Sequence, residues 1–253
     1  MLPLRDENPI VRRPVTVMVI IGINVVVWAF IQGFGNPLQL AQSFCLYALI
    51  PGELLGTVSQ YSHVQIGNEL QCPLNNNAGI LTPLTSMFLH GGWFHILGNM
   101  WFLWVFGDNV EDAMGWQRFI LFYLLCGLAA AAAQMVSNPD SMAPMVGASG
   151  AIGGVMGGYA RLYPKARVHT LIFLGIFITT VSLPAYVMLG YWFVLQLLGG
   201  IPAVDGGEGG VAFWAHVGGF VAGVLLVNLM SRPDYLADHR AQPAVRTAKH
   251  SLF

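Results

Sequence analysis

Charged side chains are scarce in this sequence. Asp, Glu, Lys and Arg make up 9% of its 253 residues, while hydrophobic residues make up 55%, and the mean hydropathy is +0.62. Soluble domains usually carry about 25% charged residues, so the composition excludes an ordinary soluble domain and predicts a membrane protein. The net charge of -1 gives no basic excess, so we expect no nucleic-acid partner.

Cysteine is also scarce. The three cysteines, Cys45, Cys72 and Cys126, are too few to form a disulfide framework. Cys45 and Cys72 fall in one loop, where they either pair or remain two free thiols. Cys126 falls in an apolar segment, where we expect it to pack against its neighbours.

Long stretches of the chain lack lysine and arginine altogether. All eleven of these residues fall in four clusters, at 5–13, 118, 161–167 and 232–249. Loops on the cytoplasmic side of membrane spans are enriched in Lys and Arg, so the four clusters predict four cytoplasmic segments. Both termini are then cytoplasmic, and the number of spans is even.

The apolar segments between these clusters predict an all-α bundle of six transmembrane helices. The first is too long for a signal peptide and has no cleavage site after it, so we expect it to remain. The run 168–201 is too long for one span and should bend at Pro184, with the crossing at 184–198. A bilayer requires about 20 residues, and the segments lie at about 15–34, 83–107, 117–136, 148–164, 168–201 and 212–230.

This interpretation divides the chain into three parts. Residues 1–14 form a cytoplasmic segment, residues 15–230 form the six-span domain, and residues 231–253 form a loose cytoplasmic tail. A long outside loop, 35–81, is rich enough in Leu, Ile and Tyr to lie at the membrane interface. Short cytoplasmic ends and the lack of organelle targeting favour a bacterial inner (plasma) membrane.

Carboxylates are absent from all six predicted spans. This absence disfavours a transporter, because ion and proton pathways usually use buried acids. It also leaves no acid within a span to orient a catalytic histidine. A hydrolytic site would then use a Ser-His dyad, unless an acid in an outside loop approaches from above: Asp140, Asp205 or Glu208.

Uncharged polar residues do occur at membrane depth, where they are costly. Chain direction brings four of them, His95, Asn99, Ser149 and His216, into one outer layer. His95 and Asn99 are four residues apart and share a helix face, so they are candidate donors to an oxyanion beside the Ser149 backbone N–H. Alone, each is more often a packing residue. The full set is Asn24, His95, Asn99, Gln134, Ser149, Gln196, His216 and Asn228.

Glycines follow Ser149 and His216 at intervals of four residues, in the strings GASGAIGGVMGG and AHVGGFVAG. Small residues let helices approach closely, so these strings predict tight packing of the fourth span on the sixth. Such packing would bring His216 within hydrogen-bond reach of Ser149, as a general base for a nucleophile requires.

A metal site is an alternative use of the histidines, if His90, His95 and His216 converge. The string HGGWFH spaces its histidines five apart and lacks the acid of the zincin motif H-E-x-x-H. We therefore expect no metal and no other cofactor.

Three strings in this order, HGGWFHILGNM, GASG and AHVGGFVAG, resemble the rhomboid family of intramembrane serine proteases over about residues 80–230. The resemblance implies Ser149 as nucleophile, His216 as general base, and His95 and Asn99 as oxyanion stabilisers. It also implies substrates that are other membrane proteins, cut in or near a transmembrane segment. His90 matches a histidine often found above the family's site, and a second candidate for site support is Gly147.

The chain departs from the family pattern one turn after the serine. Relatives tend to have an aromatic residue there, against which the base stacks, whereas this chain has Gly153. The orientation of His216 would then depend on Tyr159, Trp214 or another ring.

The leading hypothesis is an intramembrane serine endopeptidase. The alternatives are a catalytically inactive relative that binds client transmembrane helices, and a transporter. For the protease, the glycine-rich loop 200–210 is a candidate lid, and the aromatic fifth span is a candidate lateral gate. The sequence does not predict an oligomeric state.

Overall fold

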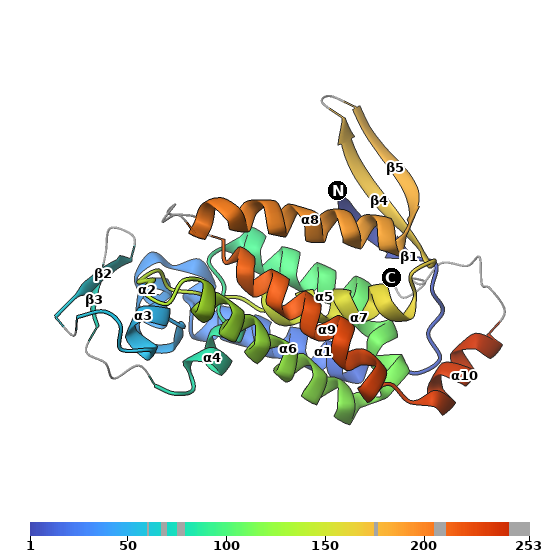
Figure 1. Ribbon diagram of the computed structural model, residues 1–253, viewed down its shortest axis with the longest axis horizontal. Coiled ribbons are helices and arrows are strands. Elements are labelled where there is room, and N and C mark those ends of the chain that lie inside the picture. The colour runs from blue at the N-terminus through green and yellow to red at the C-terminus, as the bar shows by residue number, and fades with distance from the viewer. Residues whose placement is uncertain (60, 67–69, 75–78, 175–176, 205–210, 243–253) are drawn as a thin grey trace.

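A computed structural model of the protein describes residues 1–59, 61–66, 70–74, 79–174, 177–204 and 211–242. Six helices form a bundle, one in each predicted apolar segment (Figure 1). They are α1 (Val15–Phe30), α5 (Trp93–Met114), α6 (Trp116–Ser137), α7 (Ser149–Leu162), α8 (Ala185–Val204) and α9 (Phe213–Met230).

Two of these helices, α6 and α9, are long and apolar enough to cross a membrane by length and composition alone. The helix α1 and the part of α8 from Ala185 to Ile201 are apolar but shorter. The second helix begins later than predicted, because short helices α4 (Thr82–Thr85) and η2 (Ser86–Phe88) precede α5. The break at Pro184 is confirmed, since α8 begins at the next residue.

The prediction of an all-α fold was wrong outside the helix bundle. Strands β1 (Leu2–Asp6), β4 (Arg167–Leu174) and β5 (Phe177–Pro184) form an antiparallel sheet in the order β1-β4-β5. The segments RVHTLIFL and FITTVSLP are rich in β-branched and aromatic residues, which favour strands. Pairing with β1, more than 150 residues away, gives β4 a partner on its other edge.

The long loop 35–81 is largely structured rather than extended. It contains the end of η1 (Gly33–Gly35), then α2 (Pro37–Tyr47), α3 (Pro51–Leu54) and the hairpin β2 (His63–Ile66) and β3 (Leu70–Pro73). Cys45 and Cys72 form a disulfide, with their Cα atoms 5.5 Å apart, which decides between the two alternatives left open. Closing a loop of this length contributes about 3.5 kcal/mol in the chain-entropy account. Cys126 is free and buried, as expected for a packing residue.

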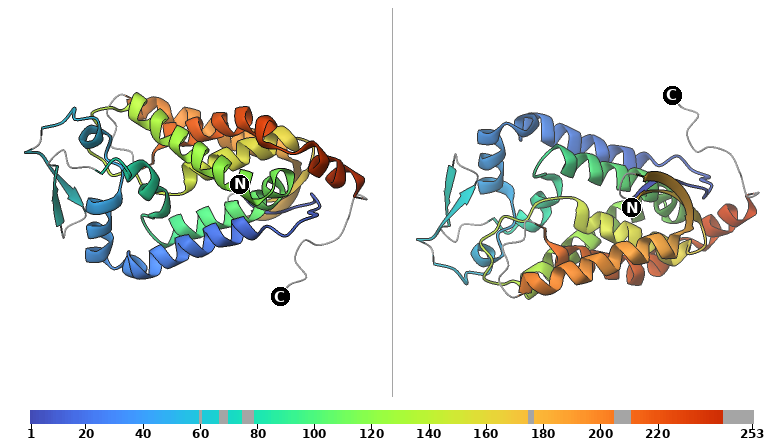
Figure 2. Two further views of the ribbon diagram at one scale, coloured as in Figure 1. Left: turned by 90° about the horizontal axis from the view of Figure 1, so that it is seen from below. Right: turned by 90° about the horizontal axis from the view of Figure 1, so that it is seen from above.

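The centre of the bundle is α7, which packs against α5, α6, α8 and α9 (Figures 1 and 2). Its contact with α9 runs backbone to backbone. A Cβ atom added at Gly219 would overlap the carbonyl oxygen of Gly150, and one at Gly223 would overlap that of Gly154. The predicted tight packing of the two glycine strings is therefore confirmed.

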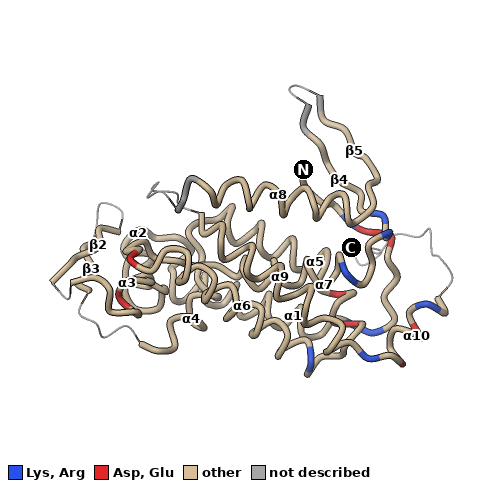
Figure 3. Tube along the Cα trace, viewed as in Figure 1, with Lys and Arg blue, Asp and Glu red and all other residues tan. Residues whose placement is uncertain are grey.

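The described Lys and Arg residues gather at one end of the bundle, which we call the basic end (Figure 3). The helix α10 (Pro233–Ala241) lies there, within the segment predicted to be a loose tail, whose last residues, 243–253, lie outside the described ones. The opposite end, where α7 begins at Ser149, is called the serine end. All four predicted basic clusters thus share one end, apart from the residues beyond 242.

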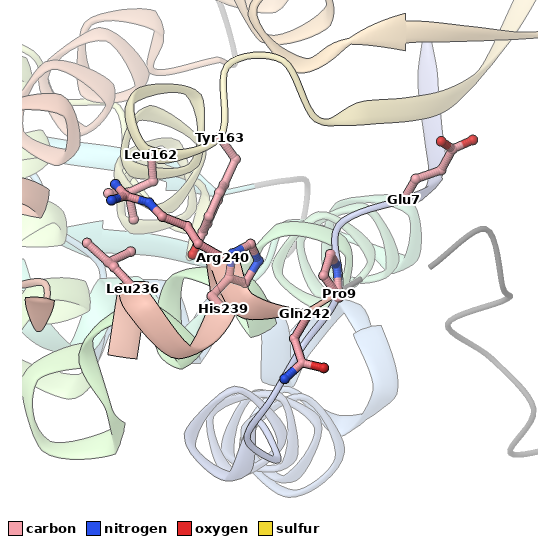
Figure 4. A pocket seen from close by; sticks show the side chains of 8 residues that line it. All are labelled: Glu7, Pro9, Leu162, Tyr163, Leu236, His239, Arg240 and Gln242. Atoms are coloured by element: carbon pink, nitrogen blue, oxygen red, sulfur yellow. The ribbon is translucent and has the colours of Figure 1, made fainter. Parts of the chain in front are cut away.

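A cavity of about 380 Å³ opens at the basic end (Figure 4). Tyr163, His239 and Arg240 are among its lining residues. It lies beyond the far end of α7 from Ser149 and contains none of the predicted site residues. We therefore place the candidate active site at the serine end.

Candidate active site

Ser149 and His216 meet at the serine end. Ser149 is the first residue of α7, and His216 lies in the first turn of α9. The distance from Ser149 Oγ to His216 Nε2 is 2.7 Å, and both residues are partly exposed. The predicted proximity of these two side chains is confirmed, and the hydroxyl is placed to donate its proton to the imidazole.

The other nitrogen of the imidazole also has a partner. Nδ1 of His216 lies 2.8 Å from Oε1 of Gln196, which comes from α8. An amide oxygen only accepts hydrogen bonds, so Nδ1 carries the proton and Nε2 carries the lone pair that faces Ser149. The sequence showed Gln196 as a polar residue at membrane depth but gave it no role.

The ring beside the His216 imidazole is Trp192, which is the other ring that the sequence left open besides Tyr159 and Trp214. Its ring centroid lies 5.7 Å from that of His216, at an interplanar angle of 39°. Tyr159 is instead fully buried and bonded to Asp6. Trp214 donates from Nε1 to the carbonyl oxygen of Gly200 at 3.1 Å.

His95 presents a donor to the site. The backbone N–H of Gly91 donates to His95 Nδ1 at 3.1 Å, so the neutral ring carries its proton on Nε2. This nitrogen faces Gly147, where an added Cβ atom would lie 2.8 Å from it and 3.5 Å from Ser149 Oγ. The structure thus brings His95, Gly147 and Ser149 together.

Gly147 is required for two reasons at this point. Its φ is +127°, a conformation that residues with a side chain rarely adopt. A side chain would also collide with the imidazole of His95. Its backbone N–H is already bonded to the carbonyl oxygen of Ser86 at 2.9 Å, so Gly147 supports the site by shape rather than as a donor.

Asn99 lies one helical turn after His95 on α5. It is buried, with 8% of its surface exposed, and its Nδ2 has no hydrogen-bond partner. Buried polar atoms are nearly always bonded, and an exception calls for an explanation. This unpaired amide donor lies on the same face of α5 as His95.

His90 is fully buried behind His95, with the two ring centroids 5.2 Å apart in an edge-to-face arrangement. Its ring nitrogens have no hydrogen-bond partner. Its backbone is held by a residue that the sequence did not single out. Gln32, also fully buried, accepts from the His90 N–H and donates to the His90 carbonyl oxygen, both at 2.9 Å.

Of the three loop acids that could approach from above, one lies among the described residues. Asp140 is exposed in the loop between α6 and α7, and Asp205 and Glu208 lie outside the described residues, as does much of the candidate lid 200–210. Within the described part of the chain, no three His, Cys, Asp or Glu residues are grouped to hold a metal ion.

The family model described as "Rhomboid domain" matches residues 78–233, more than half of the chain. This chain belongs to the rhomboid family. The match runs from just before α4 to the start of α10 and includes every candidate site residue. Rhomboid membership makes the chain an integral membrane protein with a polytopic helical bundle.

Curated rhomboid relatives are found in plants and mammals. RHOMBOID-like protein 4 of Arabidopsis thaliana is 32% identical over 172 residues, which is 67% of this chain and 39% of the relative. RHOMBOID-like protein 5 of the same plant is 31% identical over 60% of this chain and 45% of the relative. The mitochondrial presenilin-associated rhomboid-like protein of Mus musculus is 32% identical over 38% of this chain and 26% of the relative.

The matched region spans less than half the length of these rhomboid relatives. They are eukaryotic, so the bacterial inner membrane stays a prediction for this rhomboid.

Proposed function

We propose that this rhomboid is an intramembrane serine endopeptidase that cleaves transmembrane segments of other membrane proteins. The observation that carries the proposal is the 2.7 Å contact between Ser149 Oγ and His216 Nε2. A nucleophile and a base within hydrogen-bond reach, with the base oriented by a third group, is the arrangement of covalent acyl transfer.

The reaction has two halves. Ser149 Oγ attacks the peptide carbonyl carbon while His216 Nε2 takes the hydroxyl proton, giving a tetrahedral oxyanion. His216 then donates that proton to the leaving amine, and the C–N bond breaks to leave an ester on Ser149. Water, deprotonated by His216, hydrolyses the ester and returns the serine hydroxyl.

Three donors are available to the oxyanion. They are Nε2–H of His95, Nδ2–H of Asn99 and the backbone N–H of Ser149, which has no intrahelical partner because it lies in the first turn. Hydrogen bonds from preorganised donors strengthen as negative charge develops on the oxyanion. Removal of one donor typically costs about 2.7–4 kcal/mol of transition-state stabilisation. His90 and Gly147 support this part of the site through packing and shape.

For topology, we propose that residues 15–230 cross the membrane six times with both termini cytoplasmic, flanked by segments 1–14 and 231–253. The gathering of Lys and Arg at the basic end supports this orientation (Figure 3). The serine end, including the loop 35–81, then faces the outside. In a bacterium this would be the periplasmic side of the inner membrane, where the disulfide Cys45–Cys72 is stable.

The test is cleavage of a single-span model substrate, purified in detergent, by the wild type, Ser149→Ala and His216→Ala. We expect each variant to lose at least about 10³-fold in kcat, because nucleophile and base act as one unit. Both should keep the wild-type thermal midpoint within a few degrees. A serine-directed fluorophosphonate should label the wild type and not Ser149→Ala.

Equal cutting by all three proteins would overturn the proposal. Tight binding of the substrate helix without labelling or cutting would instead identify an inactive binder of client helices. Substrate flux that survives Ser149→Ala would identify a transporter.

A further inference from the structure

The base lacks a supporting ring on α7, where this chain has Gly153. The structure provides its supports from α8 instead. Trp192 and Gln196 are four residues apart on that helix, so their side chains lie on one face. Both contact the imidazole of His216, through the ring contact and through the 2.8 Å contact at Nδ1.

Gly153 makes room for this arrangement. A Cβ atom at position 153 would lie 3.1 Å from the carbonyl oxygen of His216 and 3.6 Å from Cη2 of Trp192. An aromatic side chain built on that Cβ would collide with the indole. The missing ring on α7 and the indole from α8 are therefore alternatives for one space beside the base.

Gln196 is held with its oxygen toward the imidazole. The residue is buried, with 9% of its surface exposed, and its Nε2 donates to the carbonyl oxygen of Trp192 at 3.3 Å. An amide has one accepting end and one donating end, so this backbone bond leaves Oε1 to accept from Nδ1 of His216.

The contact with Gln196 determines the tautomer of the base. An imidazole protonated at Nε2 would present an N–H to the serine hydroxyl and could not accept its proton. With Nδ1 bonded to Gln196, the lone pair of Nε2 faces Ser149 Oγ. An uncharged amide can thus take the orienting role that a carboxylate has in a Ser-His-Asp triad.

We propose that Gln196 is the positioning residue of this active site, holding the His216 imidazole with Nδ1–H on its side-chain oxygen and Nε2 toward Ser149. The inference rests on the proposed protease function. Gln196 touches His216 rather than the reacting serine, so it acts through the base. The predicted dyad becomes a Ser-His-Gln arrangement whose third member lies on α8.

The test compares Gln196→Leu, Gln196→Glu and Gln134→Leu in the full-length protein. Gln134 is a matched control, because its Oε1 accepts from the backbone N–H of Ala215 at 3.3 Å and not from the imidazole. Gln196→Leu removes the acceptor at similar size and should lower kcat about 10- to 100-fold, with KM unchanged within about twofold.

The rescue and control variants should behave differently from Gln196→Leu. Gln196→Glu keeps an oxygen acceptor and should hold kcat within about fivefold of the wild type. Gln134→Leu should stay within about threefold. Three results would each overturn the assignment. They are an unchanged kcat in Gln196→Leu, a loss of kcat in Gln134→Leu equal to that in Gln196→Leu, and a kcat in Gln196→Glu as low as that of Gln196→Leu.

A second readout does not depend on activity. Nitrogen-15 chemical shifts of histidine-labelled protein distinguish a protonated ring nitrogen from one with a lone pair, and His216→Gln identifies the relevant signal. We expect Nδ1 protonation in the wild type and a tautomer mixture in Gln196→Leu. If the wild type neither cuts the substrate nor reacts with the phosphonate, the protease proposal fails. An unchanged His216 tautomer in Gln196→Leu would instead overturn the role of Gln196.

Discussion

The two ends of α5 differ in whether their buried polar groups are hydrogen-bonded. At the basic end, Glu111 is buried and its two carboxylate oxygens accept from the backbone N–H groups of Thr16 and Val17, at 2.9 and 2.8 Å. These groups lie in the first turn of α1, where N–H donors lack intrahelical partners. At the serine end, about 18 Å along the helix by its rise per residue, Asn99 Nδ2 is buried without a partner.

A second acid of α5 at the basic end is satisfied in the same way as Glu111. Asp112 accepts from the N–H groups of Val11 and Arg12 at 2.9 and 3.0 Å, and Arg12 also pairs with Asp238. At the serine end, both ring nitrogens of His90 are unpaired as well. Satisfied groups stabilise a fold, whereas unsatisfied donors cost stability. We interpret the basic end as the part that holds the bundle together and the serine end as the part organised for a reaction.

The largest expected effect is on kcat and tests the unpaired donor at the serine end. Asn99→Ala should lower kcat about 10²- to 10³-fold, because it removes a donor that strengthens in the transition state. It should lower the thermal midpoint little, since Nδ2 makes no bond in the free protein. The measurements are single-span substrate cleavage and thermal unfolding in detergent.

A buried asparagine elsewhere serves as the control. Asn24 lies in α1 and donates to the carbonyl oxygen of Ile20 at 2.8 Å. Asn24→Leu should leave kcat within about twofold. A rate loss there equal to that of Asn99→Ala would remove the distinction between the two sites.

The next largest effect is on stability and tests the hydrogen-bonded acid at the basic end. Glu111→Gln replaces one of two accepting oxygens by an NH₂ group that faces a backbone N–H of α1. We expect a loss of about 2 kcal/mol in the free energy of unfolding, measured by denaturant titration, with kcat per folded molecule unchanged. Asp234→Asn, at an exposed pair with Arg232, is the control and should change stability little.

The smallest expected effect tests whether the contact of α7 with β1 contributes to stability alone or also to cleavage. Tyr159 lies in the last turn of α7, toward the basic end, and donates to the carboxyl group of Asp6 on β1. Tyr159→Phe should cost about 1 kcal/mol of stability and leave cleavage unchanged, as measured on folded protein. A large loss of kcat would show that β1 is coupled to the serine end.

Much of this bundle could be predicted from the sequence because its determinants are local. Each long apolar segment contains a helix of the bundle, and the glycine strings predicted the α7–α9 contact that brings Ser149 to His216. The sheet could not be predicted in this way. The pairing of Leu2 with Leu171 joins residues far apart in the chain, and the apolar run 168–183 resembles a membrane segment in composition.

The supports of the site were also missed, for a different reason. Gln196 was visible as a polar residue at membrane depth, but its target depends on how α8 rotates against α9. Gln32 acts on the backbone of His90, which no side-chain pattern encodes. The signal that could have found Gln196 is its spacing of four from Trp192, together with the absence of a ring at Gly153.

The glycine contacts of α7 and α9 have a mechanical consequence. With carbonyl groups of α7 set against Gly219 and Gly223 of α9, no side chain separates the two backbones at these two positions. A bilayer that thins, thickens or tilts the protein therefore turns both helices together. The spacing of the two backbones that carry Ser149 and His216 is set by peptide groups, so it should stay constant across lipids of different chain length.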